Sequence, residues 1–171
     1  MARLLAILGL LPLFAMSANA PATPDGDVAQ LRQLERTFAT AMNDKDADAV
    51  MAVYANEKSL FVFDVVGPPG VHVGWDEYYQ AFKRMFASID GPLRFSVSDL
   101  DVQVSGDVGY GRSLQHLSGI HIKGKKPFDY TVRVTDVYRK GGGKWLIVQE
   151  HISLPVDRET FMPILHSSLP K

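Results

Sequence analysis

The chain has 171 residues, with 18 basic and 19 acidic side chains, so its formal net charge at pH 7 is −1. A protein this close to neutrality lacks the strong positive charge that nucleic acids and anionic membranes attract, and neither is an expected partner. The chain contains no cysteine, which excludes a disulfide framework and a thiolate metal site.

Residues 1–20 have the three-part pattern of a secretory signal peptide. Arg3 precedes an apolar run from Leu4 to Met16, and Ala18-Asn19-Ala20 forms a small-x-small cleavage site. The run is too short to span a bilayer, so a retained membrane anchor is the weaker interpretation. We expect cleavage after Ala20, export to the periplasm or the extracellular space, and no membrane contact afterwards.

The remaining chain is predicted to form one domain, because its length suits a single core. Residues 21–27 are expected to be a linker, residues 28–157 the domain, and residues 158–171 a C-terminal tail. Apolar residues from Val28 to Met42 recur at helical spacing and predict a first helix that ends near Asn43. Asp46 is a suitable N-cap for a second helix whose end lies close to Asn56.

The next segments predict a strand, a third helix and four more strands. Residues 59–66 (SLFVFDVV) are rich in aromatic and β-branched side chains and are followed by a Gly-Pro-Pro-Gly turn. A helical stripe runs from Trp75 to Ile89 and is expected to end before Gly91-Pro92. Strands are predicted over about 93–104, 108–122, 127–140 and 144–154, separated by short turns. This order is typical of an α+β fold rather than of alternating βαβ units.

The last predicted strand contains two adjacent ionisable residues, Glu150 and His151. Strict alternation puts His151 on one face with Trp145 and Ile147, and Glu150 on the other with Leu146 and Val148. Both faces are largely apolar, so a curved sheet that wraps the helices would direct one residue into a cavity and the other towards an outer face. The alternation alone does not decide which residue faces inward.

These segments resemble the NTF2-like superfamily, and more narrowly SnoaL-like and ketosteroid-isomerase-like domains. The resemblance is carried by NDKDADAVMAVYAN, FVFDVVGPPGVHVGWDEYYQAF and VTDVYRKGGGKWLIVQEHISLP, and it runs from about Val28 to Asp157. It implies a cone of three N-terminal helices packed in a strongly curved, mixed or antiparallel sheet that encloses a pocket. It also implies a homodimer formed through the outer face of the sheet. Function does not follow from this fold, because it hosts isomerases, dehydratases and binding modules.

Within the resemblance, the FDVVG segment corresponds to the part of ketosteroid isomerases that holds the general base, which puts that role on Asp64. The tyrosine of the isomerase oxyanion hole corresponds to Phe38, and its neutral aspartic acid corresponds to Arg133. The loss of both donors argues against a true ketosteroid isomerase. Asp64 also has a simpler interpretation, as a partner for the Gly-Pro-Pro-Gly turn.

Three residues are the candidate catalytic groups: Asp64, Arg133 and His151. We expect Asp64 and Arg133 to converge on one cavity, because a buried charge needs a partner and a guanidinium pairs well with carboxylates. The alternative for Arg133 is an ion pair at the surface or at an interface. His151 is a candidate proton shuttle, with a structural role at an interface as the alternative. The predicted pocket-lining residues are Phe38, Tyr54, Trp75, Tyr78 and Glu150.

The chemistry of the pocket stays open between two hypotheses. The histidines show no ligand spacing, and no nucleotide-binding or nucleophile motif is present, so no metal and no cofactor are expected. The first hypothesis is proton transfer of isomerase or dehydratase type on a small organic substrate. The second is a non-catalytic module that binds a small organic acid, or a dimerisation scaffold.

Overall fold

The computed structural model describes residues 24–67 and 70–169. The predicted signal peptide, residues 1–20, lies outside the described residues. Helix α1 spans Pro24–Asp44, so it begins within the segment that was expected to be a linker. Helix α2 is a single turn, Ala47–Met51, and the side chain of Asp46 caps it by accepting a hydrogen bond from the amide of Ala49. Helix α3 spans Trp75–Ala87.

Six strands form one mixed sheet in the order β2-β1-β6-β5-β4-β3. Their bounds are Phe61–Phe63 for β1, Val71–Val73 for β2, Ile89–Ser105 for β3, Val108–His121 for β4, Pro127–Gly141 for β5 and Lys144–Ser153 for β6. Strands β3 to β6 are antiparallel neighbours, whereas β1 runs parallel to β6. A 3-10 turn, η1 (Lys123–Lys125), joins β4 to β5. The predicted α+β cone is confirmed.

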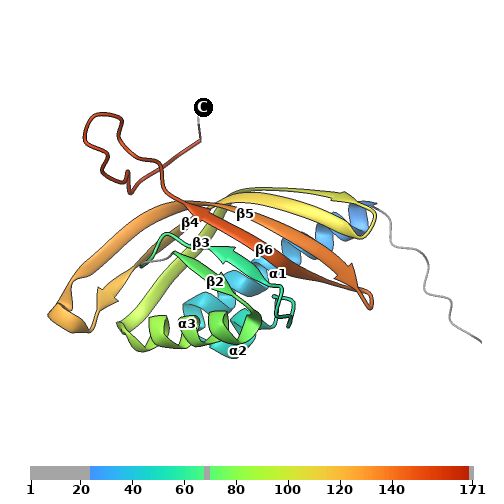
Figure 1. The fold of residues 1–171 in the computed structure, drawn as a ribbon, viewed down its shortest axis with the longest axis horizontal. Coiled ribbons are helices and arrows are strands. Elements are labelled where there is room, and N and C mark those ends of the chain that lie inside the picture. Colours follow the sequence, from blue (N-terminus) through green and yellow to red (C-terminus); the bar gives the residue numbers. More distant parts are fainter. Residues whose placement is uncertain (1–23, 68–69, 170–171) are drawn as a thin grey trace, which may run out of the picture.

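Figure 1 shows the long strands arching over α1, with α2 and α3 on the same side of the sheet. The core lies between these layers, since α1 buries Leu31, Phe38 and Met42 and α3 buries Tyr78 and Phe82. Burial of such apolar surface is the main favourable contribution to folding.

Several boundaries differ from the sequence-based expectation: α2 ends at Met51 rather than close to Asn56, β1 covers Phe61–Phe63 rather than 59–66, and β3 begins at Ile89 rather than near residue 93. Gly91 and Pro92 do not stop a helix, because α3 already ends at Ala87 and both residues lie inside β3. The pairing of β3 with β4 shifts register between Asp90 and Arg94, so these residues form an irregularity within the strand. Gly91 has a φ of 69°, a conformation that glycine adopts without strain.

The segment after β6 extends the domain beyond its last strand. Val156 and Pro163 form an isolated bridge, and the amide of Thr131 on β5 donates to the carbonyl of Leu165. Figure 1 shows this segment as a loop beyond the end of β6. The described part of the predicted C-terminal tail therefore contacts the edge of β5 that β6 leaves uncovered.

Candidate functional site

A cavity of about 590 Å³ lies between the helices and the inner face of the sheet. Its walls are mostly apolar and come from α1, α3 and strands β3 to β6. Phe38, Phe82, Phe95 and Leu117 are among them. Four polar side chains, Asp64, His72, Tyr78 and Glu150, also line it and belong to one connected region. A small-molecule site commonly combines such a largely apolar cavity with a few convergent polar groups.

A β-bulge decides that Glu150 faces the cavity. Val137 pairs with Gln149 but the next residue of β5, Tyr138, pairs with Ile147, so Val148 is an extra residue in β6. The extra residue interrupts the alternation of faces. Trp145 and Ile147 point into the core before the bulge, and Glu150 points inward after it.

Glu150 is buried, with an exposed fraction of 1%. Its Oε2 accepts hydrogen bonds from the hydroxyl of Tyr78 at 2.7 Å and from that of Tyr54 at 3.1 Å. Burial raises the pKa of Glu150 from its ordinary value of 4.5 to about 7; the two tyrosine hydrogen bonds oppose the increase, and nearby Glu35 and Asp64 add to it. A carboxyl with this pKa exchanges its proton readily near neutral pH.

Two different elements bring the tyrosines to Glu150. Tyr54 follows α2, where the chain pairs with the edge of β6: the amide of Ile147 donates to Val53, and the amide of Ala55 donates to Ile147. Tyr78 lies in the first turns of α3, and its ring meets that of Tyr54 edge-on at 5.3 Å. Burial, followed by the charge of Glu150, raises the pKa of both tyrosines well above the usual range, so both stay protonated hydrogen-bond donors.

The hairpin of β1 and β2 supplies the second polar group of the cavity, the pair Asp64 and His72. The amide of Asp64 donates to the carbonyl of Gly70, and Gly70 has a φ of 69°. A Cβ at Gly70 would lie 2.8 Å from the carbonyl oxygen of Asp64, so this tight turn requires glycine. Asp64 Oδ1 accepts from the amide of Val66, which leaves Oδ2 for His72 Nε2 at 3.2 Å.

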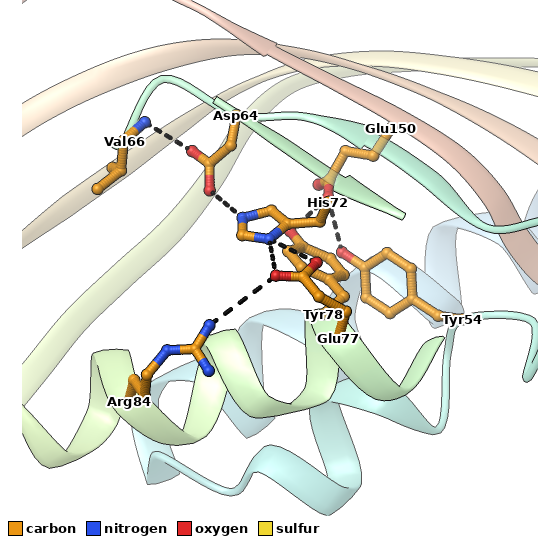
Figure 2. A network of polar contacts seen from close by, with 8 residues as sticks. All are labelled: Tyr54, Asp64, Val66, His72, Glu77, Tyr78, Arg84 and Glu150. Carbon is orange, nitrogen blue, oxygen red and sulfur yellow. Dashed lines mark hydrogen bonds and ion pairs between the residues drawn. The ribbon is translucent and has the colours of Figure 1, made fainter. Parts of the chain in front are cut away.

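His72 lies between two carboxylates (Figure 2). Its Nδ1 is 2.8 Å from Glu77 Oε2, while Nε2 faces Asp64. Ionised carboxylates only accept hydrogen bonds, so an imidazolium with both N–H groups satisfies the two contacts together. The ring of His72 also packs on that of Tyr78, with 5.0 Å between the centroids. Arg84 lies 3.9 Å from Glu77 at the solvent side of this network.

Two carboxyl groups that can accept or donate a proton, Asp64 and Glu150, lie in one region of a largely apolar cavity. Asp64 is a carboxylate held by N–H donors, and Glu150 is a buried carboxyl held by hydroxyl donors. Both hydrogen bonds to Glu150 use Oε2, so Oε1 is available to a ligand. Carboxyl groups in such different environments can serve as a base and an acid in one reaction.

The structure brings together most of the predicted pocket residues. Phe38, Tyr78, Glu150 and Asp64 line the cavity, and Tyr54 lies directly behind Glu150. Trp75 does not line it: its indole N–H donates to the carbonyl of Met51, and its ring stacks on Tyr79.

The expected convergence of Asp64 and Arg133 is not found. Along β5 the side chains of Val132, Val134 and Asp136 point inward, which directs Arg133 to the exposed outer face. His151 is also exposed on that face, where its ring lies 5.2 Å from that of Phe63. Neither residue lines the cavity, because the period of two along a strand puts each on the side opposite its inward-facing neighbours.

Sequence reasoning missed most polar residues of the interior, among them His72, Glu35 and Asp136. His72 could have been found from the hairpin, because pairing the residues that flank the Gly-Pro-Pro-Gly turn puts VHV beside FVFD. Glu35 and Asp136 carry no such signal. A glutamate in an amphipathic helix and an aspartate in a strand are usually solvent-exposed.

Metal and membrane features were also sought within residues 24–67 and 70–169. No group of three or more histidine, aspartate or glutamate side chains in this part of the chain could hold a metal ion. Among the same residues, no helix combines the length and the apolar character that a membrane crossing requires.

The comparisons with known proteins agree with the fold. The SnoaL-like domain matches residues 31–157, which is more than half of the chain. An NTF2-like protein of unknown function from Pseudomonas putida KT2440 has 26% sequence identity and a TM-score of 0.70, over 81% of this chain and 95% of that one. Curated proteins gave no significant match.

Two more distant structures share the fold. A proposed dehydratase of the NTF2-like family from Streptomyces avermitilis is 20% identical, with a TM-score of 0.66 over 84% of this chain and 99% of that one. A ketosteroid isomerase-like protein from Erwinia carotovora atroseptica is 20% identical, with a TM-score of 0.62 over 74% and 94%. These two structures show the shared NTF2-like fold, and the domain matched over residues 31–157 shows that the chain belongs to the SnoaL-like family.

Proposed function

We propose that this protein is an enzyme that moves a proton within a small, uncharged and largely apolar organic molecule, in an isomerisation or a dehydration. The observation that carries the proposal is Glu150, a carboxyl buried at the cavity wall with a pKa of about 7. Burying such a group is costly even when it is hydrogen-bonded, and carboxyls with a strongly perturbed pKa in a cavity are frequently catalytic.

In this proposal Asp64 is the general base and Glu150 is the general acid. Asp64 removes a proton from a carbon next to a substrate carbonyl, while protonated Glu150 donates from Oε1 to the carbonyl oxygen, and an enol forms. Transfer of the proton from Asp64 to another carbon, with return of the enol O–H proton to Glu150, completes an isomerisation and restores both carboxyl groups. For dehydration, Glu150 instead gives its proton to a departing hydroxyl, which leaves as water. General acids and bases of this kind contribute about 10² to 10⁴-fold each.

Tyr54, Tyr78 and His72 position these two carboxyls. The tyrosine hydroxyls hold Oε2 of Glu150, which fixes the direction of Oε1. His72 holds Oδ2 of Asp64 and is itself held by Glu77. The reacting groups are thus oriented before a substrate enters, and such orientation lowers the barrier of a reaction between groups held in place.

The charge of the cavity favours an uncharged substrate. Arg84 is the one lysine or arginine among the described lining residues, and its side chain is 67% exposed and directed at Glu77. His72 also lines the cavity, but its two ring nitrogens already contact Asp64 and Glu77. A carboxylate ligand would therefore meet Asp64 and Glu150 without a further buried cation to balance its charge. This argues against the small organic acid that an inward-facing Arg133 would have bound.

Hydrogen exchange tests the proposal without knowledge of the natural substrate. The purified protein is incubated in deuterium oxide with a panel of neutral cyclic ketones, and deuterium uptake next to the carbonyl is followed by mass spectrometry. We expect uptake above the buffer rate for some ketones, with a loss of about 10²-fold or more in Asp64→Asn and Glu150→Gln. His151→Gln is the matched control, because it changes the neighbouring residue on the outer face.

Uptake at the buffer rate for every ketone that binds would contradict the enzyme and leave a binding module. Tight binding of small carboxylic acids in preference to ketones would contradict the proposed substrate class.

We also propose that residues 1–20 direct export to the periplasm or the extracellular space, and that two copies associate through the outer face of the sheet. The signal-peptide pattern supports export. Exposed aromatic side chains on strands of the sheet, Phe63 at 44% and Tyr110 at 45%, support association. The mass of the mature chain recovered from cell fractions tests cleavage after Ala20, and sedimentation at micromolar concentration tests the dimer.

A further inference from the structure

Three carboxyl groups are buried together between α1 and the inner face of the sheet. They are Glu35 of α1, Asp136 of β5 and Glu150 of β6, with exposed fractions of 2%, 3% and 1%. Asp136 and Glu150 are direct partners in the β5–β6 register and point to the same face. Glu35 accepts a 2.6 Å hydrogen bond from Tyr138, which lies two residues beyond Asp136 on that face of β5. Only Glu150 lines the ligand cavity.

This carboxyl cluster, Glu35 with Asp136 and Glu150, contains no cation. None of the ion pairs formed in residues 24–67 and 70–169 involves any of its three members. Tyrosine hydroxyls donate hydrogen bonds to Glu35 and Glu150, whereas Oδ1 of Asp136 is buried without a hydrogen-bond partner. An ionised carboxylate in that position would be strongly unfavourable, and a protonated one much less so.

We propose that Glu35 and Asp136 are positioning residues for Glu150, and that the carboxyl cluster binds and releases protons as one unit. Asp136 keeps its proton, and the charge of Glu35 opposes ionisation of Glu150. Glu150 is the member that exchanges a proton with the cavity. The proposal rests on the proposed function of Glu150 as an acid, but its test needs no substrate.

The titratable groups around Glu150 come from every element that packs near it. They are Glu35 of α1, Tyr54 after α2, Asp64 after β1, His72 of β2, Tyr78 of α3, and Asp136 and Tyr138 of β5. His72, the one group of this set that can carry a positive charge, is bonded to Asp64 and Glu77 instead. The three carboxyls therefore lack a counter-charge, and their mutual repulsion is not cancelled.

The electrostatics of the cluster agree with this division of roles. Burial raises the pKa of Asp136 well above the usual range, and the charges of Glu150 and Glu35 raise it further. Burial also raises the pKa of Glu35, while the hydrogen bond from Tyr138 partly offsets the increase. In strongly interacting sites the protons leave in steps that belong to the group as a whole.

A pH titration of carbon-13-labelled carboxyl groups by NMR, in the ligand-free protein, tests the proposal. Glu35→Gln removes the opposing charge, so we expect the midpoint of Glu150 to fall by about one pH unit, a tenfold loss of proton affinity. Asp136→Asn imitates a protonated aspartic acid. It should therefore leave the midpoint of Glu150 nearly unchanged and abolish a second carboxyl titration at higher pH.

Asp27→Asn is the matched control in the same helix. Asp27 is also buried, but it is paired with Lys140 and with the indole of Trp145, and the hydrogen bond from Lys140 lowers its pKa. This variant should leave the midpoint of Glu150 unchanged. If Glu35→Gln does not fold, Tyr138→Phe replaces it: loss of the donor favours neutral Glu35, so the midpoint of Glu150 should again fall.

An unchanged Glu150 midpoint in the folded Glu35 or Tyr138 variant would overturn the proposal. Titration of Asp136 in the ordinary acidic range of carboxyls would do the same. Neither outcome depends on turnover, so a protein that shows the expected midpoints but no deuterium uptake would refute the enzyme alone.

Discussion

Acidic side chains occur in two contrasting settings, each of which contributes one carboxyl group to the wall of the cavity: Asp64 in the first and Glu150 in the second. At the mouth of the cavity, Asp64 and Glu77 are partly exposed and share His72, with Arg84 nearby. In the interior, Glu35, Asp136 and Glu150 are buried; tyrosine hydroxyls donate to Glu35 and Glu150, and Oδ1 of Asp136 has no hydrogen-bond partner.

This difference explains how one small domain can hold an ionised and a protonated carboxyl group within the same site. Cationic and N–H partners stabilise a carboxylate, as at Asp64, whereas burial without a cation favours the neutral acid, as at Glu150. Whether a carboxyl group is ionised or protonated therefore depends on whether it lies beside the β1–β2 hairpin, as Asp64 does, or in the interior near α1, as Glu150 does. Four substitution experiments test this contrast.

The largest expected effect is that of Glu150→Gln on the pH dependence of stability. Because the folded pKa of Glu150 is about 7 and its ordinary value is 4.5, the folded state binds more protons between these pH values. Stability contributed by this group is then present below pH 4.5 and is lost as the pH rises towards 7, by about 3 kcal/mol. Glu150→Gln should remove that part of the slope, as measured by urea unfolding at a series of pH values. Equal slopes in both proteins would contradict the raised pKa.

A smaller effect is expected for Tyr78→Phe, which keeps the ring and removes one of the two donors to Glu150. Hydrogen bonds to charged groups contribute about 1.5 to 3 kcal/mol, and these donors favour the ionised form. The NMR midpoint of Glu150 should therefore rise by about one to two pH units. Tyr79→Phe is the control, because the hydroxyl of Tyr79 donates to exposed Asp48. If the midpoint of Glu150 falls or does not change in Tyr78→Phe, the role of this donor is refuted.

At the mouth, His72→Gln should cost about 1 kcal/mol of unfolding free energy, since partly exposed ion pairs contribute little. The expected loss is smaller at high salt, where ion pairs are screened. Thermal melts at low and high salt concentration measure both quantities. A loss as large as that of a buried core residue would contradict the small stabilising contribution expected of these ion pairs.

The smallest effect is expected for Arg133→Ala and His151→Ala on the outer face. Each should change the unfolding free energy of the isolated domain by no more than about 0.5 kcal/mol and leave ketone binding unaltered. Calorimetric titration with a bound ketone, together with unfolding curves, tests this. Weaker ketone binding in either variant would mean that these residues reach the cavity after all.

Much of the fold could be predicted from the sequence, because its signals are local. Asp46 as a helix cap and the strands from β3 to β6 follow from capping chemistry and from residue periodicity. Of the two interpretations of Asp64, the turn partner is seen in the structure, because one carboxylate oxygen accepts from the amide of Val66 while the other faces His72. Its role as a general base stays a prediction.

The rest of the site depends on features that periodicity does not carry. The extra residue Val148 reverses the faces of β6, so strict alternation groups Trp145 with His151 instead of with Glu150. Arg133 was assigned to the pocket through the resemblance, whereas its inward-facing neighbours Val132 and Val134 direct it outward. Glu35 lies on the buried stripe of α1 among apolar residues, and only the tertiary contact with Tyr138 explains its presence there.

The central claim is that Glu150 is a carboxyl that exchanges its proton near neutral pH inside the cavity. Its most direct test is the carbon-13 NMR titration of the Glu150 carboxyl in the ligand-free wild-type protein, from about pH 4 to about pH 9, assigned by the signal that Glu150→Gln removes. We predict a midpoint of about 7. A midpoint in the range of an ordinary exposed glutamate, about 4 to 5, would contradict the account.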